Sequence, residues 1–151
     1  METTNKNSTV AFINLSTLSQ YFIPFGNFIF PIIIWTTNKD KSEYINQQGK
    51  DTINFQLSLL IYSFVLALIA IPIVLITFFQ NVSFTAFANG NDFHIDHFNF
   101  NQITGVVSIA VFALFLFIFM KVAEFFLIIY ASLKTSNGDA FKYPLTIAFL
   151  K

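Results

Sequence analysis

The sequence predicts an all-α integral membrane protein, and three observations lead to this fold class. Hydrophobic residues make up 55% of the 151 residues and charged residues only 11%, whereas a typical soluble domain has about 25% charged residues. Two apolar segments reach the roughly 20 residues that a helix needs to cross a bilayer. A third apolar region, near the N-terminus, is interrupted by helix-breaking residues. We therefore expect a single membrane domain over residues 1–151 with about four helical segments.

The N-terminal region, residues 8–36, is apolar but contains the break IPFGN, in which Pro24 and Gly26 both disfavour helix. Pro31 follows shortly after this helix-break motif. The helices on either side are too short to cross a bilayer alone. The region is therefore either a single broken span or a helical hairpin that enters the membrane and returns, and we favour the hairpin.

Residues 54–80 and 103–133 are predicted to be full transmembrane helices. The segment 37–53 carries three Lys and the tail 134–151 carries three more, whereas the loop 81–102 has none. The positive-inside rule therefore places the first segment and the tail in the cytoplasm and the loop 81–102 outside. METTNKNSTV lacks the basic region and cleavage site of a signal peptide, so we expect a multi-pass protein that keeps this N-terminus.

The outer loop has a β-hairpin pattern. VSFTAFA and DFHIDHFNF alternate apolar and polar residues and flank Asn89-Gly90-Asn91, a turn signal. We expect a small extracytoplasmic β-hairpin that docks on the helices or the headgroups, because an isolated hairpin is marginally stable in water. The tail is predicted to turn at Asn137-Gly138 and to pack along the cytoplasmic interface.

Composition excludes several classes of function. All eight cations are Lys and the net charge is zero, so no basic surface for nucleic acid is expected. The chain has no Cys, which excludes disulfides and thiolate chemistry. His94, Asp96 and His97 fit no metal signature, and we predict neither a metal site nor a cofactor. No nucleophile motif is present, so we expect no enzyme activity.

Polar residues within the apolar segments are the candidate functional residues. Lys121 and Glu124 lie three apart and share a helix face, and intramembrane charge is a functional hypothesis by default. Two polar stripes could meet this pair, namely Asn54, Ser58 and Tyr62 in one segment and Asn14, Thr17 and Tyr21 in the other. The stripes are either ordinary interhelical contacts or the lining of a polar cavity. The pair is either a working site, or neutralised against a neighbouring helix, or near the inner interface, which Lys121 reaches by snorkelling.

Several short motifs resemble a Tic-twenty-like family of small bacterial membrane proteins, which has no assigned molecular function and is related to a chloroplast protein-import component. The resemblance lies in Ile23, Pro24, Gly26, Pro31, Trp35, Gln48, Gly49, Asn54, Phe55, Gln56, Ser58, Gly138, Tyr143 and Pro144. It implies a compact helical membrane domain in the bacterial cytoplasmic (inner) membrane and no catalysis. The chain departs from the family at Asn14, where members often have His, and in having only Lys where members carry Arg.

These observations leave two hypotheses for function. The first is a small accessory or scaffold subunit of a membrane protein complex, in protein translocation or assembly, whose partners are the lipid bilayer and other membrane proteins or further copies. The alternative is an oligomeric channel or transporter for ions or small solutes that uses the polar intramembrane residues.

Overall fold

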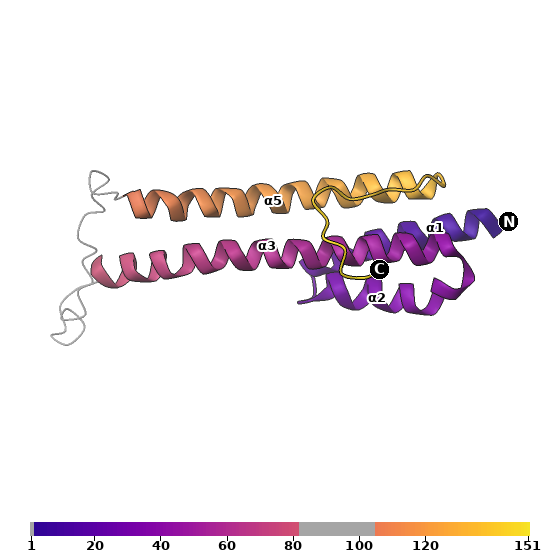
Figure 1. Cartoon of the computed structure of the whole chain (residues 1–151), viewed down its shortest axis with the longest axis horizontal. Coiled ribbons are helices and arrows are strands. Elements are labelled where there is room, and N and C mark those ends of the chain that lie inside the picture. The colour runs from indigo at the N-terminus through magenta and orange to yellow at the C-terminus, as the bar shows by residue number, and fades with distance from the viewer. Residues whose placement is uncertain (1, 82–104) are drawn as a thin grey trace. The chain divides into compact units, whose positions relative to one another are not determined.

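The structure is a computed structural model that describes residues 2–81 and 105–151, and four α-helices occur in these ranges (Figure 1). They are α1 (Glu2–Ser16), α2 (Gly26–Asn38), α3 (Glu43–Asn81) and α5 (Gly105–Ser136). Two 3-10 helices, η1 (Thr17–Tyr21) and η2 (Lys39–Lys41), follow α1 and α2. The described ranges contain no strand. The predicted outer β-hairpin lies outside the described residues.

The two long helices are apolar and largely uncovered by protein. Glu43–Thr77 and Val107–Ser136 are each long and apolar enough to cross a membrane, and only 6% and 17% of their most apolar stretches are buried. The core helix of a soluble protein is apolar because it is buried, so this combination favours lipid as the surrounding medium. The described residues thus form a helical structure with an extended tail, and two of their helices are candidate membrane spans.

Helix α3 begins at Glu43, well before residue 54, where the sequence predicts its start. The segment 37–53, predicted to be a cytoplasmic loop, therefore contains the first turns of this helix. These turns are amphipathic, because Ile45 and Thr52 are buried while Glu43 and Gln47 are exposed. The polar residues of these turns are typical of a loop sequence. The turns are helical because their buried face packs against the rest of the first unit.

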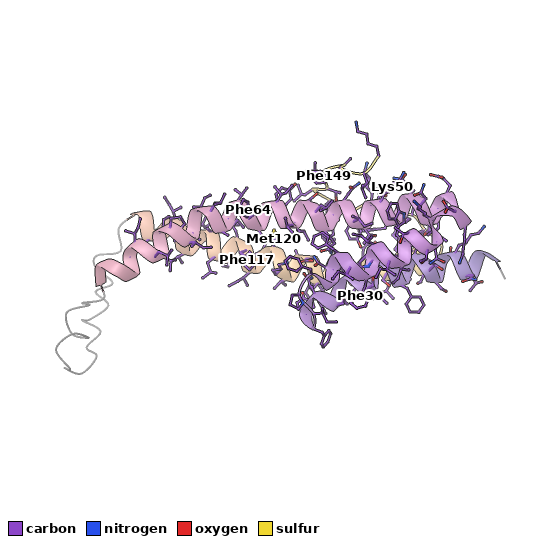
Figure 2. The ribbon with its side chains drawn as sticks, turned by 90° about the horizontal axis from the view of Figure 1, so that it is seen from below. Phe30, Lys50, Phe64, Phe117, Met120 and Phe149 are labelled. Atoms are coloured by element: carbon purple, nitrogen blue, oxygen red, sulfur yellow. The ribbon has the colours of Figure 1, made fainter. Side chains whose placement is uncertain are left out.

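The chain divides into two compact units. The first unit comprises Met1–Tyr62 and Met120–Lys151, and the second comprises Ser63–Phe119. In the second unit the apolar side chains are widely exposed, as Phe64 illustrates (Figure 2). The polar side chains discussed below belong to the first unit.

In the first unit α1 and α2 form an antiparallel helical hairpin. Val10 and Ile13 of α1 pack in one cluster with Ile34 and Trp35 of α2, together with Ile45 of α3. Residues near the end of α2 thus face residues in the middle of α1, which requires the chain to reverse between them. The N-terminal region therefore has the hairpin arrangement rather than that of a single broken span.

The reversal takes place at the helix-break motif. The N–H groups of Phe22 and Ile23 donate to the carbonyl of Ser19 at 3.0 and 2.9 Å. Phe25 then has a left-handed backbone, with φ of 60°, before α2 begins. Pro24 lies in this turn, whereas Pro31 is buried inside α2.

The C-terminal end of α5 leads into an extended tail. Gly138 has φ of 92°, a left-handed conformation that glycine adopts without steric cost. Its N–H donates to the carbonyl of Thr135 at 3.0 Å and that of Asp139 donates to Lys134 at 3.3 Å, which is a Schellman motif. Beyond it Phe141 and Tyr143 are buried in a cluster with Phe55, Leu59 and Ala131.

Candidate functional site

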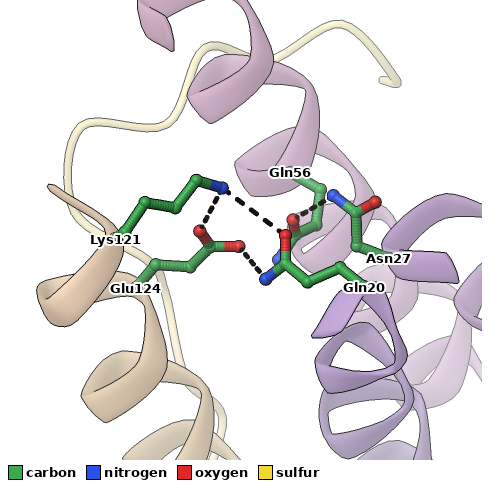
Figure 3. Close-up of polar contacts among 5 residues, drawn as sticks. All are labelled: Gln20, Asn27, Gln56, Lys121 and Glu124. Carbon is green, nitrogen blue, oxygen red and sulfur yellow. Dashed lines mark hydrogen bonds and ion pairs between the residues drawn. The ribbon is translucent and has the colours of Figure 1, made fainter. Parts of the chain in front are cut away.

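The charged pair of α5 is held by a glutamine from the helical hairpin (Figure 3). The Nζ of Lys121 lies 2.8 Å from Oε2 of Glu124, and the side chain of Glu124 is fully buried while that of Lys121 is 33% exposed. Gln20 in η1 donates from Nε2 to Oε1 of Glu124 at 2.8 Å. Its Oε1 accepts from Lys121 at 3.5 Å. Both carboxylate oxygens therefore have partners, which a buried charge requires.

Two further amides lie beside this group, and Figure 3 shows the five side chains together. Asn27 of α2 donates from Nδ2 to Oε1 of Gln56 in α3 at 2.8 Å. Gln56 is 1% exposed, and its Nε2 has no hydrogen-bond partner within the part of the chain that the structure describes. An unpaired buried amide costs about 1–3 kcal/mol. We call Gln20, Asn27, Gln56, Lys121 and Glu124 the amide–charge cluster.

A second polar network is centred on Asn14. Its Oδ1 accepts hydrogen bonds from Thr52 at 2.6 Å and from Tyr143 at 3.0 Å, and its Nδ2 donates to Thr135 at 3.1 Å. All four side chains are almost completely buried. The network joins α1, α3, α5 and the tail. Thr17 is also buried, but its hydroxyl donates to the carbonyl of Asn14 within the same hairpin arm at 2.7 Å.

Burial has an electrostatic consequence at the tail. It raises the pKa of the Tyr143 phenol well above its ordinary value, because a phenolate would lose its hydration in this position. The phenol is therefore neutral at physiological pH and acts as a hydrogen-bond donor to Asn14.

The stripe of Asn54, Ser58 and Tyr62 on α3 contacts the tail and not the charged pair. Each of the three side chains hydrogen-bonds to backbone atoms of residues 145–150. Among the sequence candidates, the structure thus brings Lys121 and Glu124 together and places Asn14 in a separate network. It does not bring the stripe on α3 to the pair, whereas Tyr21 of the other stripe lies close to Glu124, with its ring against that of Phe125.

The sequence did not predict that Gln20, Asn27 and Gln56 belong to a site. A signal was present, because Gln20 and Asn27 flank the helix break on both sides and are amides in an apolar stretch. Gln56 lies two positions after Asn54, so it is on a different face of the helix from the stripe, whose residues are spaced four apart. Their convergence depends on the hairpin.

Among the described residues no three His, Cys, Asp or Glu side chains come close enough to hold a metal ion. His94, Asp96 and His97 lie outside the described residues. The cluster has one carboxylate and one ammonium group, which neutralise one another.

Comparison with known proteins identifies the family. The model of the magnetosome magnetite crystal formation protein family, MamF/MmsF, matches residues 5–150. The chain belongs to the MamF/MmsF family. No curated protein and no solved structure matches this chain.

Membership of the MamF/MmsF family corrects the resemblance to a Tic-twenty-like family, which is wrong. The motifs behind that resemblance are the helix break before α2, the close contact of Gly49 with Trp35 and the turn at Gly138, which are features of packing and chain reversal and do not by themselves identify a family. The role in protein translocation that the resemblance suggested has no support. The family and the two apolar helices together indicate a membrane protein.

Proposed function

We propose that this chain is an integral membrane protein that acts without catalysis, as an accessory or scaffold subunit that holds other membrane proteins or further copies of itself. One observation carries the proposal. The polar side chains in the interior of the first unit pair mostly with one another or with the tail, while the apolar surfaces of α3 and α5 are uncovered. Such helices are stable in lipid or against the transmembrane surfaces of partners.

The family suggests the setting. Its description refers to the formation of magnetite crystals in magnetosomes, and we extend this setting to the chain. The protein then belongs to the membrane of the magnetosome. The excess of Lys in the tail supports a cytoplasmic C-terminus.

Photo-crosslinking in native membranes tests the scaffold role. A photoreactive amino acid is placed at Phe64 or Phe119, which are both exposed in the second unit, and at the buried Phe141 as a control. We expect adducts with membrane proteins or second copies from the exposed positions and only the monomer from Phe141. A chain that remains a monomer at all three positions contradicts the scaffold role.

A deletion in the bacterium that carries this chain tests the setting. We expect magnetite crystals of altered size or number in electron micrographs, restored when the chain is supplied from a plasmid. A fluorescent fusion should mark the magnetosome membrane. Unchanged crystals, together with a fusion that is found only in other membranes, would contradict the magnetosome setting. The scaffold role would then be judged by the crosslinking experiment alone.

The unpaired amide of Gln56 favours a channel or transporter as a second candidate function. A buried donor next to a charged pair can bind a passing acceptor group, and broken helices often present such groups to solutes. The test is flux into liposomes that contain the purified chain. Flux that is present in the natural chain and lost in the double variant Lys121→Leu with Glu124→Leu supports this function. Absence of flux over a panel of ions and small solutes excludes it.

A further inference from the structure

The outer face of α2 and the turn before it form one apolar surface. Phe25 in the turn, Ile29 and Ile33 follow one another at four-residue steps, so they share a face of the helix. Their exposed fractions are 68%, 47% and 54%. Phe30 and Ile32, on either side of this row, are exposed as well. We call Phe25, Ile29, Phe30, Ile32 and Ile33 the hairpin face.

Helix α2 runs along α3 in the opposite direction (Figure 1). Asn27, near the start of α2, donates to Gln56 of α3 at 2.8 Å, whereas Trp35, near its end, donates to the carbonyl of Asn46 at 3.2 Å. Because α3 is a candidate membrane span, α2 follows the direction in which α3 crosses the bilayer. The turn before α2 points toward the bilayer interior, since Gln56 is closer than Asn46 to the apolar part of α3.

Neither water nor the headgroup layer is a suitable cover for the hairpin face. Large apolar side chains gathered on one face are unfavourable in water, and such patches mark interaction sites. The hydrocarbon is about 30 Å thick and the bilayer with its headgroups about 40–45 Å, so each headgroup layer measures about 5–8 Å. From Phe25 to Ile33 the helix rises by about 12 Å. The hairpin face is therefore longer than the headgroup layer is thick.

Hydrocarbon alone is excluded by the backbone of the turn. The N–H groups of Phe22 and Ile23 donate to Ser19, and the carbonyls of Ile23 and Phe25 accept from α2. The N–H of Phe25 and the carbonyls of Phe22 and Pro24 have no hydrogen-bond partner within the described residues. Unpaired groups are costly in lipid, and irregular backbone at membrane depth is stable only against protein or in a water-filled cavity. A cavity of water is unfavourable here, because the side chain of Phe22 is 87% exposed.

We propose that a second copy of the chain covers the hairpin face, in a symmetric dimer whose two-fold axis lies along the membrane normal. Two copies inserted in the same sense are related by such an axis, so each residue meets its counterpart at its own depth. The free N–H of Phe25 in each copy then donates to the carbonyl of Phe22 or Pro24 in the other. Ile29 and Ile33 pack against the same row of the second copy. This inference rests on the proposed scaffold role in a membrane and names its partner.

The charge and the shape of the hairpin favour a second copy over an unrelated protein. Residues 7–38 contain no Asp, Glu, Lys or Arg, so contact between two identical hairpins brings no like charges together. An identical hairpin also presents its turn and its apolar row at the same depths. Both the unpaired backbone groups and the apolar side chains therefore find partners without a shift along the membrane normal.

Disulfide crosslinking tests the dimer directly, because the chain has no Cys. Single cysteines replace Ile29, Ile33 or, as a control, Leu133, which is 62% exposed on α5 of the same unit. The full chain is placed in liposomes at low protein density and oxidised. A residue beside a two-fold axis lies close to its own counterpart. We therefore expect Ile29→Cys and Ile33→Cys to form linked dimers and Leu133→Cys to remain a monomer.

The other outcomes overturn the proposal and separate it from the scaffold role. Monomers at positions 29 and 33 mean that no second copy covers the hairpin face. Dimers at all three positions mean that association is unspecific. If a photoreactive amino acid at position 29 links to a different membrane protein in native membranes, the face belongs to that partner and the scaffold role stands. If positions 64 and 119 also give no adduct, the scaffold role fails together with the dimer.

A charge on the hairpin face should separate the two copies. Ile33→Asp places two carboxylates next to each other at the axis, so the dissociation constant of the dimer should rise at least about tenfold. It is measured by energy transfer between donor-labelled and acceptor-labelled copies in liposomes. Leu133→Asp is the matched control and should leave the dissociation constant unchanged. Ile29→Ser serves if Ile33→Asp does not insert, with a smaller rise. Unchanged energy transfer in the inserted variant contradicts the dimer.

Discussion

Asn14 in α1 and Tyr143 in the tail are joined by a hydrogen bond of 3.0 Å, although 129 positions separate them in the sequence. The oxygen that accepts this bond also accepts one from Thr52 at 2.6 Å. A single amide thus fixes the first helix, α3 and the tail relative to one another within the first unit.

Replacing Asn14 by Leu should destabilise the first unit strongly. The change leaves the buried hydroxyls of Thr52, Thr135 and Tyr143 with fewer partners, and each unsatisfied buried group costs about 1–3 kcal/mol. We expect a loss of about 3 kcal/mol in unfolding free energy, measured by denaturant titration in detergent micelles. Asn5→Leu on the exposed side of α1 is the control and should change stability by less than about 0.5 kcal/mol. An equal loss in both variants would show that the network is not the cause.

Stability should fall at high pH because of Tyr143. Burial raises the pKa of this phenol in the folded state, so its contribution is fully present below the ordinary tyrosine pKa of about 10. Above that pH the unfolded phenol ionises while the folded one remains neutral, and the unfolding free energy falls by about 1.4 kcal/mol per pH unit. Tyr143→Phe should flatten this decline when stability is compared at pH 8 and pH 11. A decline of the same slope in the variant argues against Tyr143 as its source.

The charged pair should behave as a coupled unit. Lys121→Leu leaves the buried carboxylate of Glu124 with only Gln20 as its partner. We expect the unfolding free energy to fall by about 2–4 kcal/mol. This is less than for a fully buried ion pair, because the side chain of Lys121 is 33% exposed. The double variant with Glu124→Leu should recover more than half of that loss, since no unpaired charge remains. Additive losses in a double-mutant cycle would mean that the two groups do not interact.

Gly49 should not tolerate a side chain. A Cβ at this position would lie 2.1 Å from Cδ1 of Trp35, whose indole N–H donates to the carbonyl of Asn46 at 3.2 Å. Gly49→Ala should therefore lower the unfolding free energy by about 1–3 kcal/mol, because the indole must move. The movement should also shift the Trp fluorescence, which reports on Trp35 alone because the chain has one Trp. Gly105→Ala is the control, as a Cβ at that position would have no neighbouring atom within 4 Å. A Gly49→Ala chain with unchanged emission and stability would contradict the close contact.

Local patterns in the sequence were sufficient to predict the two long apolar helices and the shared face of the charged pair. The apolar runs predict two spans within α3 and α5, because hydropathy along one segment is a property of that segment alone. The spacing of Lys121 and Glu124 predicts a shared face, and the structure places their charged atoms 2.8 Å apart. The start of α3 was missed because the polar face of its first turns resembles a loop.

By itself, then, the sequence determined that the chain is apolar, that it contains two segments long enough to cross a bilayer as helices, and that Lys121 and Glu124 share one helix face. Only the tertiary structure decided that Gln20 completes that pair, that Asn14 binds Tyr143, and that Asn54 holds the backbone of the tail. The reason is that periodicity shows which face of a helix a side chain occupies, but not which distant segment lies opposite that face. A hydrogen bond forms only where folding brings a donor and an acceptor together, and that depends on the hairpin and on the reversal of the tail.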